Sequence, residues 1–313
     1  MDKSIYMITI VVIVRNEQNK IEDFLNSLLH AKEINTCEVI FIDGNSTDNT
    51  LNILKNNSGK FKNIKIIKCK KYGYSYQRNV GVLRASGEFI LFLSADIKVN
   101  KNIIIKYKNE INRQKNDCIQ GSILYIGKGA IKKAFIDFNK LTDTCNSFST
   151  VNTIVKKEKL INYAFDENVK ACEDKIWFFN NNKEITYKID HTNFIYHYLD
   201  DKLTEIGRKL FIENVELYKY FGYKMMKKHN MIYSKVNLLT LFCIFCLFLD
   251  LTILIVSKNP ILLVLYILCI IIFALFYSSI KKLSFLQLSY IIFFSLCSFL
   301  GSLRGSMLYE KRK

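Results

Sequence analysis

The feature that most constrains this chain is an abrupt change in composition near residue 235. Charged residues are common before that point and almost vanish beyond it, although hydrophobic residues make up 50% of the sequence. Three apolar runs follow, each long enough to cross about 30 Å of hydrocarbon as a helix: 236–257, 260–280 and 283–303. We therefore predict three parts: a globular domain over 1–200, a basic amphipathic segment over 201–235, and a membrane domain over 236–313 with two to three transmembrane helices.

The sequence is also strongly basic. Lys and Arg total 45 against 28 Asp and Glu, a formal net charge of +17, which suits an anionic membrane face, phosphorylated ligands or nucleic acid. Because Lys, Asn and Ile are abundant throughout, part of this charge is compositional, and we predict no nucleic-acid partner. The segment 201–235 is predicted to be either an ordinary domain helix or a helix that lies on the membrane surface.

The amino-terminal sequence lacks the features of an export signal. Its first apolar stretch, residues 7–14, is short and is followed by Arg15-Asn16-Glu17. The nine cysteines are dispersed, as is typical of reduced thiols. We expect a multi-pass membrane protein whose large domain faces the cytoplasm. The basic tail at 304–313 would then lie outside if all three runs span, so the number of spans stays open.

Residues 7–100 alternate between strand and helix patterns. Strands are predicted at 7–14, 38–43, 63–68 and 88–93, with apolar residues at helical spacing over 21–29 and a helix over 75–85. This alternation predicts an α/β fold with an open, mostly parallel sheet covered by helices on both faces. Ligands of such sheets bind beyond the carboxyl ends of the strands.

Polar clusters occur where this fold would place a ligand. The clusters are Arg15-Asn16-Glu17, Asp43-Gly44-Asn45-Ser46-Thr47-Asp48, Gln77-Arg78-Asn79 and Ser94-Ala95-Asp96. The second cluster taken alone would equally suit a turn and a helix cap. Polar residues at neighbouring strand ends can, however, bind one nucleotide together.

The order of these clusters resembles glycosyltransferase family 2, whose members have the Rossmann-like GT-A fold. The matching motifs are Arg-Asn-Glu at 15–17, Asp-Gly-x-Ser-x-Asp-x-Thr at 43–50, Arg-Asn-x-Gly at 78–81 and Ser-Gly-Glu-Phe-Ile-Leu-Phe-Leu-x-x-Asp at 86–96. The resemblance implies that Asp43 bonds the base of a nucleotide-sugar donor and that Arg78 lies against the nucleotide. The complete implied donor-binding set is Arg15, Asn16, Glu17, Asp43, Ser46, Arg78, Asn79 and Ser94.

The resemblance also implies a divalent metal, Mg²⁺ or Mn²⁺, on the donor diphosphate. The family's Asp-x-Asp motif is Ser94-Ala95-Asp96 here, so one carboxylate remains. Mg²⁺ is often held by one or two carboxylates plus substrate phosphates, so Asp96 can suffice. His197 matches a histidine that reaches the metal in many relatives, although it can equally be a structural residue. A hydroxyl residue at the position of Ser94, before the retained Asp, also resembles rhamnosyltransferase-like members of the family.

One motif in the second half is similar to the family's Glu-Asp pair: Glu173-Asp174, with the only tryptophan, Trp177, in the matching place. The resemblance makes Asp174 the base that takes a proton from the acceptor hydroxyl in an inverting transfer, with Glu173 beside it. If these residues open a helix running to about Asn180, its amino end favours an ionised carboxylate. The alternative is that both are ordinary acidic residues of a first helical turn.

Together these features predict a non-processive glycosyltransferase, since the Gln-x-x-Arg-Trp signature of processive synthases is absent from the sequence. It would move a hexosyl or deoxyhexosyl group from a nucleotide sugar to a polyprenyl-linked or other membrane glycan, in contact with membrane lipid. The alternative is a catalytically inactive nucleotide-binding membrane scaffold, to which the Ser94 replacement points. A dehydrogenase is disfavoured, because no Gly-x-Gly-x-x-Gly follows the first strand.

Overall fold

The structure, a computed structural model, describes residues 7–113, 116–126 and 148–198, together with a few helical positions between 136 and 220. The chain forms two compact units, Met1–Ile126 with Ser147–Leu199, and Gly127–Asn146 with Asp200–Lys313. Within the described residues, no helix is long and apolar enough to cross a membrane. The three predicted apolar runs lie outside those residues.

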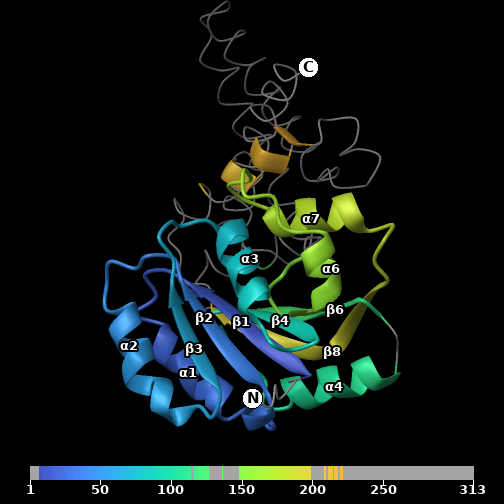
Figure 1. Cartoon of the computed structure of the whole chain (residues 1–313). Helices are drawn as coiled ribbons and strands as arrows, with labels where there is room; N and C mark the ends of the chain where they lie inside the picture. Colours follow the sequence, from blue (N-terminus) through green and yellow to red (C-terminus); the bar gives the residue numbers. More distant parts are fainter. Residues whose placement is uncertain are drawn as a thin grey trace, which may run out of the picture. The chain divides into compact units, whose positions relative to one another are not determined.

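The first unit is built on a mixed sheet with the strand order β3-β2-β1-β4-β7-β6-β8-β5 (Figure 1). The strands are β1 Ile8–Val14, β2 Glu38–Asp43, β3 Ile64–Lys68, β4 Phe89–Ser94, β5 Ile97–Lys98, β6 Cys118–Ile126, β7 Thr153–Lys156 and β8 Tyr187–Tyr198. β3, β2, β1 and β4 are parallel, as predicted. β7 is antiparallel to both of its neighbours, and β5 is antiparallel to β8. The predicted open α/β sheet is confirmed, and its second half is mixed.

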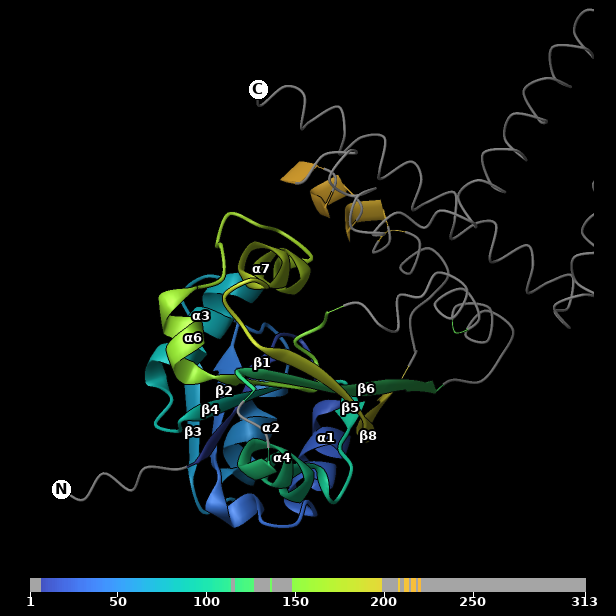
Figure 2. The same ribbon diagram turned by 90° about the vertical axis from the view of Figure 1, so that its right-hand side faces the viewer.

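Helices cover both faces of this sheet. The helices are α1 Ile21–Leu29, α2 Thr50–Asn57, α3 Tyr74–Arg84, α4 Ile103–Arg113, α6 Lys157–Asn162 and α7 Glu173–Asn181, with short 3₁₀ turns η1 Ile34–Thr36 and η2 Ser58–Lys60. Figure 2 shows α1, α2 and α4 on one face and α3, α6 and α7 on the other. The helices predicted over 21–29, 75–85 and 173–180 are confirmed to within about one residue.

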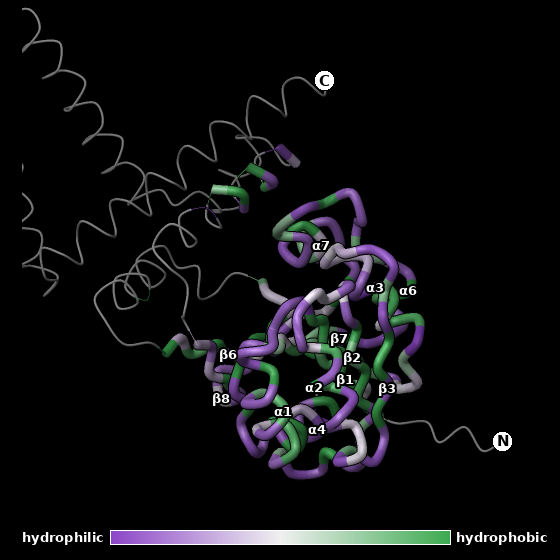
Figure 3. The backbone as a smooth tube through the Cα atoms, turned by 90° about the vertical axis from the view of Figure 1, so that its left-hand side faces the viewer, coloured by the Kyte–Doolittle hydropathy of each residue, from purple (hydrophilic) through white to green (hydrophobic). Residues whose placement is uncertain are grey.

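The central strands are buried on both faces, which explains their continuous apolar sequences. In β1, Ile8, Ile10 and Val12 pack into the core beneath α1, whereas Val11 packs into the opposite core beneath α3. Figure 3 shows hydrophobic residues along these strands and hydrophilic residues in the outer loops. Gly81 of α3 lies so close to β1 that an added Cβ would come within 2.5 Å of Val11 Cγ1. The absence of a side chain there lets α3 lie directly on the sheet.

Candidate functional site

The strand directions bring the predicted clusters to one edge of the sheet. β1, β2 and β4 are parallel, so Val14, Asp43 and Ser94 end at the same edge. β7 is antiparallel to β4, with Thr153 opposite Phe92, so the segment that precedes β7 also lies at this edge. β8 runs parallel to β6 and ends there too. We call this the carboxyl edge.

The loops after β1 and β2 are bonded to each other at the carboxyl edge. The backbone N–H of Asn16 donates to Ser46 Oγ at 3.0 Å, and Asn16 Oδ1 accepts from the Thr47 N–H at 2.9 Å. The N–H of Glu17 donates to Thr50 Oγ1 at 2.7 Å. Asn16 adopts a positive φ of 55°, which asparagine tolerates better than most residues. Asn16 and Ser46 therefore hold the loops after β1 and β2 together at the carboxyl edge.

Asp43 is fully buried at the end of β2, where its carboxylate accepts from the backbone N–H and the hydroxyl of Ser46. Gln77 of α3 lies beside it and was not predicted as a site residue. Gln77 Nε2 donates to the carbonyls of Ile42 at 2.9 Å and Val14 at 3.3 Å, so one amide joins the ends of β1 and β2. Its Oε1 is buried without a hydrogen-bond partner among the described residues. The only sequence signal for Gln77 was its position next to Arg78.

Arg15 lies against an aromatic pair that the sequence analysis also missed. Its guanidinium carbon is 4.1 Å from the centroid of the Tyr72 ring, within the range of a cation–π contact. The rings of Tyr72 and Tyr74 meet edge to face at 5.3 Å. They are 40% and 42% exposed, unusually open for large aromatic side chains, so this surface is accessible to a ligand. The available signal was the two tyrosines that flank Gly73, the residue immediately before α3.

Arg78 forms an ion pair with Glu173 at the start of α7. Only 8% of the Arg78 side chain and 7% of the Glu173 side chain are exposed. Burial raises the pKa of Glu173, the neighbouring Asp174 adds to this, and the Arg78 charge opposes it. Arg78 Nε is buried and has no hydrogen-bond partner within the described residues. Two residues predicted for separate tasks are thus in direct contact.

Asn79, the next residue of α3, binds the loop that leads to α7. Its Nδ2 donates to the Phe165 carbonyl at 2.9 Å, and its Oδ1 accepts from the Phe165 N–H at 3.0 Å. The amide also donates to Glu167 at 3.2 Å. These bonds occupy the side chain, so in this structure Asn79 organises the loop.

Asp96, Ser94 and His197 form a cluster at the end of β4. The Ser94 hydroxyl donates to Asp96 Oδ1, and His197 Nε2 lies 3.3 Å from Asp96 Oδ2. Pairing of Ile97 with His197 between β5 and β8 brings the histidine there. Burial by itself would raise the pKa of Asp96, but the hydrogen bond and charge of His197 and the Ser94 hydroxyl hold that pKa well below its usual range.

Asp174 is half-buried at the beginning of α7. Its Oδ2 accepts from the backbone N–H of Thr150 at 3.1 Å, and its Oδ1 accepts from the Lys175 N–H at 2.8 Å. Thr150 belongs to the segment before β7 and was not predicted. Trp177, one turn further along α7, is buried and donates its indole N–H to the Tyr163 carbonyl. The tryptophan therefore anchors the helix whose first turn carries the acidic pair.

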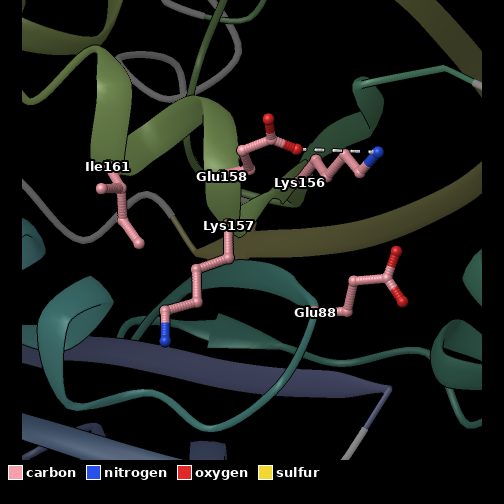
Figure 4. A pocket seen from close by; sticks show the side chains of 5 residues that line it. All are labelled: Glu88, Lys156, Lys157, Glu158 and Ile161. Carbon is pink, nitrogen blue, oxygen red and sulfur yellow. Dashed lines mark ion pairs between the residues drawn. The ribbon is translucent and has the colours of Figure 1, made fainter.

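A separate hollow lies at the opposite edge of the sheet (Figure 4). It is open, about 480 Å³ in volume, and lined by Glu88, Lys156, Lys157, Glu158 and Ile161. Glu88 precedes β4 and Lys156 ends β7, which places the hollow at the amino end of β4. Lys157 Nζ already donates to the Ala85 carbonyl at 2.7 Å. None of the predicted site residues lines this hollow.

The donor set at Asp96 fits a divalent cation. Ligand atoms of Asp and His lie about 2.0–2.2 Å from a bound metal, so two such atoms 3.3 Å apart can share one ion. Among the residues that the structure describes, no group of three or more His, Cys, Asp and Glu side chains could hold a metal. Asp96 and His197 would therefore need oxygen ligands from a substrate or water, as Mg²⁺ sites commonly do.

Comparison with known proteins gives a consistent result. The family model described as glycosyl transferase family 2 matches residues 9–191. A poly(ribitol-phosphate) beta-glucosyltransferase of Bacillus spizizenii is 28% identical over 210 residues, which cover 61% of this chain and 32% of that protein. The chain spans about a third of the length of the first curated relatives it matches.

Solved structures share the fold. S. aureus TarS 1–349 in complex with UDP-GlcNAc superimposes with a TM-score of 0.53 at 20% identity, covering 67% of this chain and 66% of that one. Mannosyltransferase PcManGT from Pyrobaculum calidifontis, in complex with GDP-Man and Mn²⁺, superimposes with a TM-score of 0.66 at 12% identity, covering 94% of this chain and 87% of that one. At these identities the similarity concerns the fold alone.

Proposed function

The chain belongs to glycosyl transferase family 2, and we propose that it is an inverting, non-processive enzyme that moves a sugar from a nucleotide-diphosphate donor to a membrane-associated glycan. The observation that carries this proposal is the meeting, at one sheet edge, of Asp43, the Asp96–His197 pair and Asp174. In this proposal Asp43 contacts the nucleobase, the Asp96–His197 pair lies at the diphosphate, and the Asp174 carboxylate accepts a proton.

The donor would bind along the ends of β1, β2 and β4. The nucleobase would lie near Asp43 and the Arg15–Tyr72 contact, where an exposed guanidinium and aromatic ring give a flat surface for stacking. Gln77 keeps the ends of β1 and β2 at a fixed separation through its two carbonyl contacts. A pocket held in this way needs little reorganisation when a nucleotide enters.

The diphosphate would lie near Ser94, Asp96 and His197. The Asp96 carboxylate would be a metal ligand, since Mg²⁺ is bound through carboxylate oxygens together with substrate phosphates. A divalent cation held by Asp96 and His197 would supply neutralising charge to the leaving diphosphate. The Ser94 hydroxyl fixes the Asp96 carboxylate by hydrogen bonding, which partly replaces the orienting role of a second acidic side chain.

Asp174 would take the proton of the acceptor hydroxyl as the new glycosidic bond forms. Its carboxylate is oriented by the backbone N–H groups of Thr150 and Lys175, which donate to its two oxygens. In an inverting transfer the catalytic base lies on the face of the sugar opposite the leaving group. Asp174 is on α7, a different element from the strands that carry Ser94 and His197. One proton and one sugar move in each encounter.

The acceptor is proposed to be a membrane-associated glycan, and the names of the relatives make an anionic poly(ribitol phosphate) chain the first to test. The net charge of +17 supports this choice, because a basic protein attracts a polyanion at long range. We also propose that the apolar runs 236–257, 260–280 and 283–303 anchor the protein, with its catalytic domain in the cytoplasm, where it would reach a polyprenyl-linked glycan. Truncation after residue 235 should then retain donor binding but lose activity on membrane-bound acceptors.

The decisive experiment is a transfer assay. The purified full chain is incubated with Mn²⁺, a panel of UDP-, GDP- and dTDP-sugars, and either poly(ribitol phosphate) or a polyprenyl-linked glycan, and the product is identified by mass spectrometry. Asp96→Asn should lower turnover by about two orders of magnitude, and chelation of the metal should abolish it. A chain that binds nucleotide but transfers no sugar to any acceptor would instead support the scaffold alternative.

A further inference from the structure

The Arg78–Glu173 ion pair connects two helices of the site, α3 and α7. Arg78 projects from the middle of α3, and Glu173 is the first residue of α7, 95 positions later. Both side chains are more than nine-tenths buried. A buried charge that loses its partner is strongly destabilising, so the two side chains form one unit rather than two independent groups.

Glu173 is poorly suited to act as the base. Its Oε1 is occupied by Arg78, and an acceptor hydroxyl would have to displace that contact to reach it. Asp174, by contrast, is more exposed, and its carboxylate oxygens accept from the backbone N–H groups of Thr150 and Lys175. The two carboxylates therefore differ: Glu173 is paired with Arg78 of α3, whereas Asp174 is accessible to substrate.

The ion pair is one of several features that define the start of α7. Cys172, immediately before it, has a positive φ of 57°, so the chain turns sharply into the helix at this point. Trp177 fixes the following turn through its burial and its contact with the Phe165 ring at 5.5 Å. Glu173, next to Asp174, ties the first turn of α7 to α3 through Arg78.

We propose that the Arg78–Glu173 pair is a strut that joins α3 to α7 and holds Asp174 in position for proton transfer. Glu173 is then a positioning residue that acts through Asp174. This inference rests on the proposed function of the same site. It assigns Arg78 a role in placing the base, in addition to the role beside the nucleotide that the family resemblance implies.

The structure offers a matched control for this strut. Lys71, just before α3, pairs with Glu167, just before α7, at 3.0 Å. This second ion pair connects the same two segments, but its side chains are 60% and 39% exposed. Solvent-exposed pairs contribute little to stability. Glu167→Gln should therefore leave turnover unchanged, and it keeps an oxygen to accept the Asn79 amide.

The test is a double-mutant cycle on Glu173→Gln and Asp174→Asn in the full chain. Misplacement of a reacting group by about 1 Å costs about 100-fold, so Glu173→Gln should lower kcat roughly 10-fold to 100-fold. Binding of the probe nucleotides UDP and GDP with Mn²⁺ should stay within about twofold, because the donor contacts remain. Since Glu173 acts through Asp174, the double variant should be no slower than Asp174→Asn alone.

Two kinetic outcomes would overturn the strut. Wild-type kcat in Glu173→Gln would show that Asp174 needs no such support. A loss in the double variant equal to the product of the single losses would show that Glu173 acts independently of Asp174. If Glu173→Gln does not fold, Glu173→Asp keeps the charge on a shorter side chain and is expected to show the same selective loss of kcat.

A measurement independent of catalysis separates failure of the strut from failure of the proposed function. In Glu173→Gln, amide hydrogen exchange should accelerate in the first turn of α7 while the amides of β1 and β2 keep wild-type rates. Wild-type exchange in α7 would refute the strut even if sugar transfer is found. Absence of sugar transfer by the wild-type chain, with accelerated exchange in the variant, would refute the proposed function and leave the strut standing.

Discussion

The two halves of the sheet hold their predicted site residues in different ways. In the first half, formed by β1 to β4, the residues after one strand bond to the residues after the next, as Asn16 does with Ser46 and Thr47. In the second half, formed by β6 to β8 and α7, Glu173 is held by Arg78 from the other half, and Asp174 is held by Thr150 from the segment before β7. The loops after β1 and β2 are thus held by each other, whereas the Glu173–Asp174 pair is held by residues from other parts of the chain.

The largest effect that tests this comparison is expected at Asp174. Asp174→Asn removes the proton acceptor but keeps the shape, so turnover should fall by about two to four orders of magnitude. Calorimetry with UDP or GDP should show donor affinity near the wild-type value, because Asp174 is not among the residues proposed to contact the nucleotide. Glu158→Gln, at a 67% exposed side chain on the opposite edge, serves as the control. Comparable turnover in Asp174→Asn would contradict the assignment of the base.

The long-range character of the second half predicts a large loss of stability at Asn152. This residue is fully buried with a positive φ of 63°, and its Nδ2 donates to the Ser122 and Asn193 carbonyls at 3.0 and 3.2 Å. Tyr107 donates to its side chain at 2.9 Å. Asn152→Ala removes the donor to both carbonyls and strains the backbone, although Tyr107 keeps its bond to the backbone carbonyl of residue 152 at 2.6 Å. Urea unfolding should therefore show a loss of about 3 kcal/mol.

Asn152→Gly separates the two causes of that loss. It removes the same hydrogen bonds but tolerates the positive φ, so it should be less destabilising than Asn152→Ala by about 1 kcal/mol. Equal stability of the two variants would mean that backbone strain contributes nothing at this position.

The next smaller effect is expected in the first half, where Glu38 should make the free energy of unfolding depend on pH. Burial alone would raise the pKa of Glu38, but hydrogen bonds from Lys65, Thr9 and Ser86 lower it below its usual value. The unfolded chain therefore binds a proton more readily, and the stabilisation is complete above about pH 4.5 and is lost as the pH falls further. Urea titrations from pH 7 to 3 should show a shallower acid loss in Glu38→Gln, whereas an unchanged slope would exclude Glu38 as a cause.

The smallest predicted effect concerns donor affinity at Tyr72. Tyr72→Leu removes the ring on which we propose that the nucleotide base stacks beside Arg15, and one aromatic stacking contact is worth about 0.5–1 kcal/mol. UDP or GDP should therefore bind about two- to fivefold more weakly, with kcat unaltered. Tyr72→Phe keeps the ring and should bind like the wild type. A larger loss in kcat than in affinity would place Tyr72 on the acceptor side instead.

The sequence predicted the first half in detail because its signals are local. Continuous β-branched residues at 7–14 and the Asp43 turn each report a buried strand or its end, and the structure follows them. The mixed second half escaped prediction, since β7 has only four residues and its antiparallel direction depends on which strands it packs between. Thr150 and Gln77 were missed for a related reason: each acts through backbone or amide contacts to distant residues, which leave no pattern in the sequence.

The amide contacts of Gln77 have a consequence for how the protein is made. Gln77 reaches the Val14 carbonyl across 63 positions and the Ile42 carbonyl across 35. During synthesis, the ends of β1 and β2 therefore lack their common donor until α3 has left the ribosome, and domains generally fold as units from the amino terminus. A nascent chain stalled before α3 should be unable to hold a nucleotide. One released just beyond β4 would have the ends of β1 and β2 joined through Gln77, while Asp96, His197 and the base-bearing helix are still untranslated.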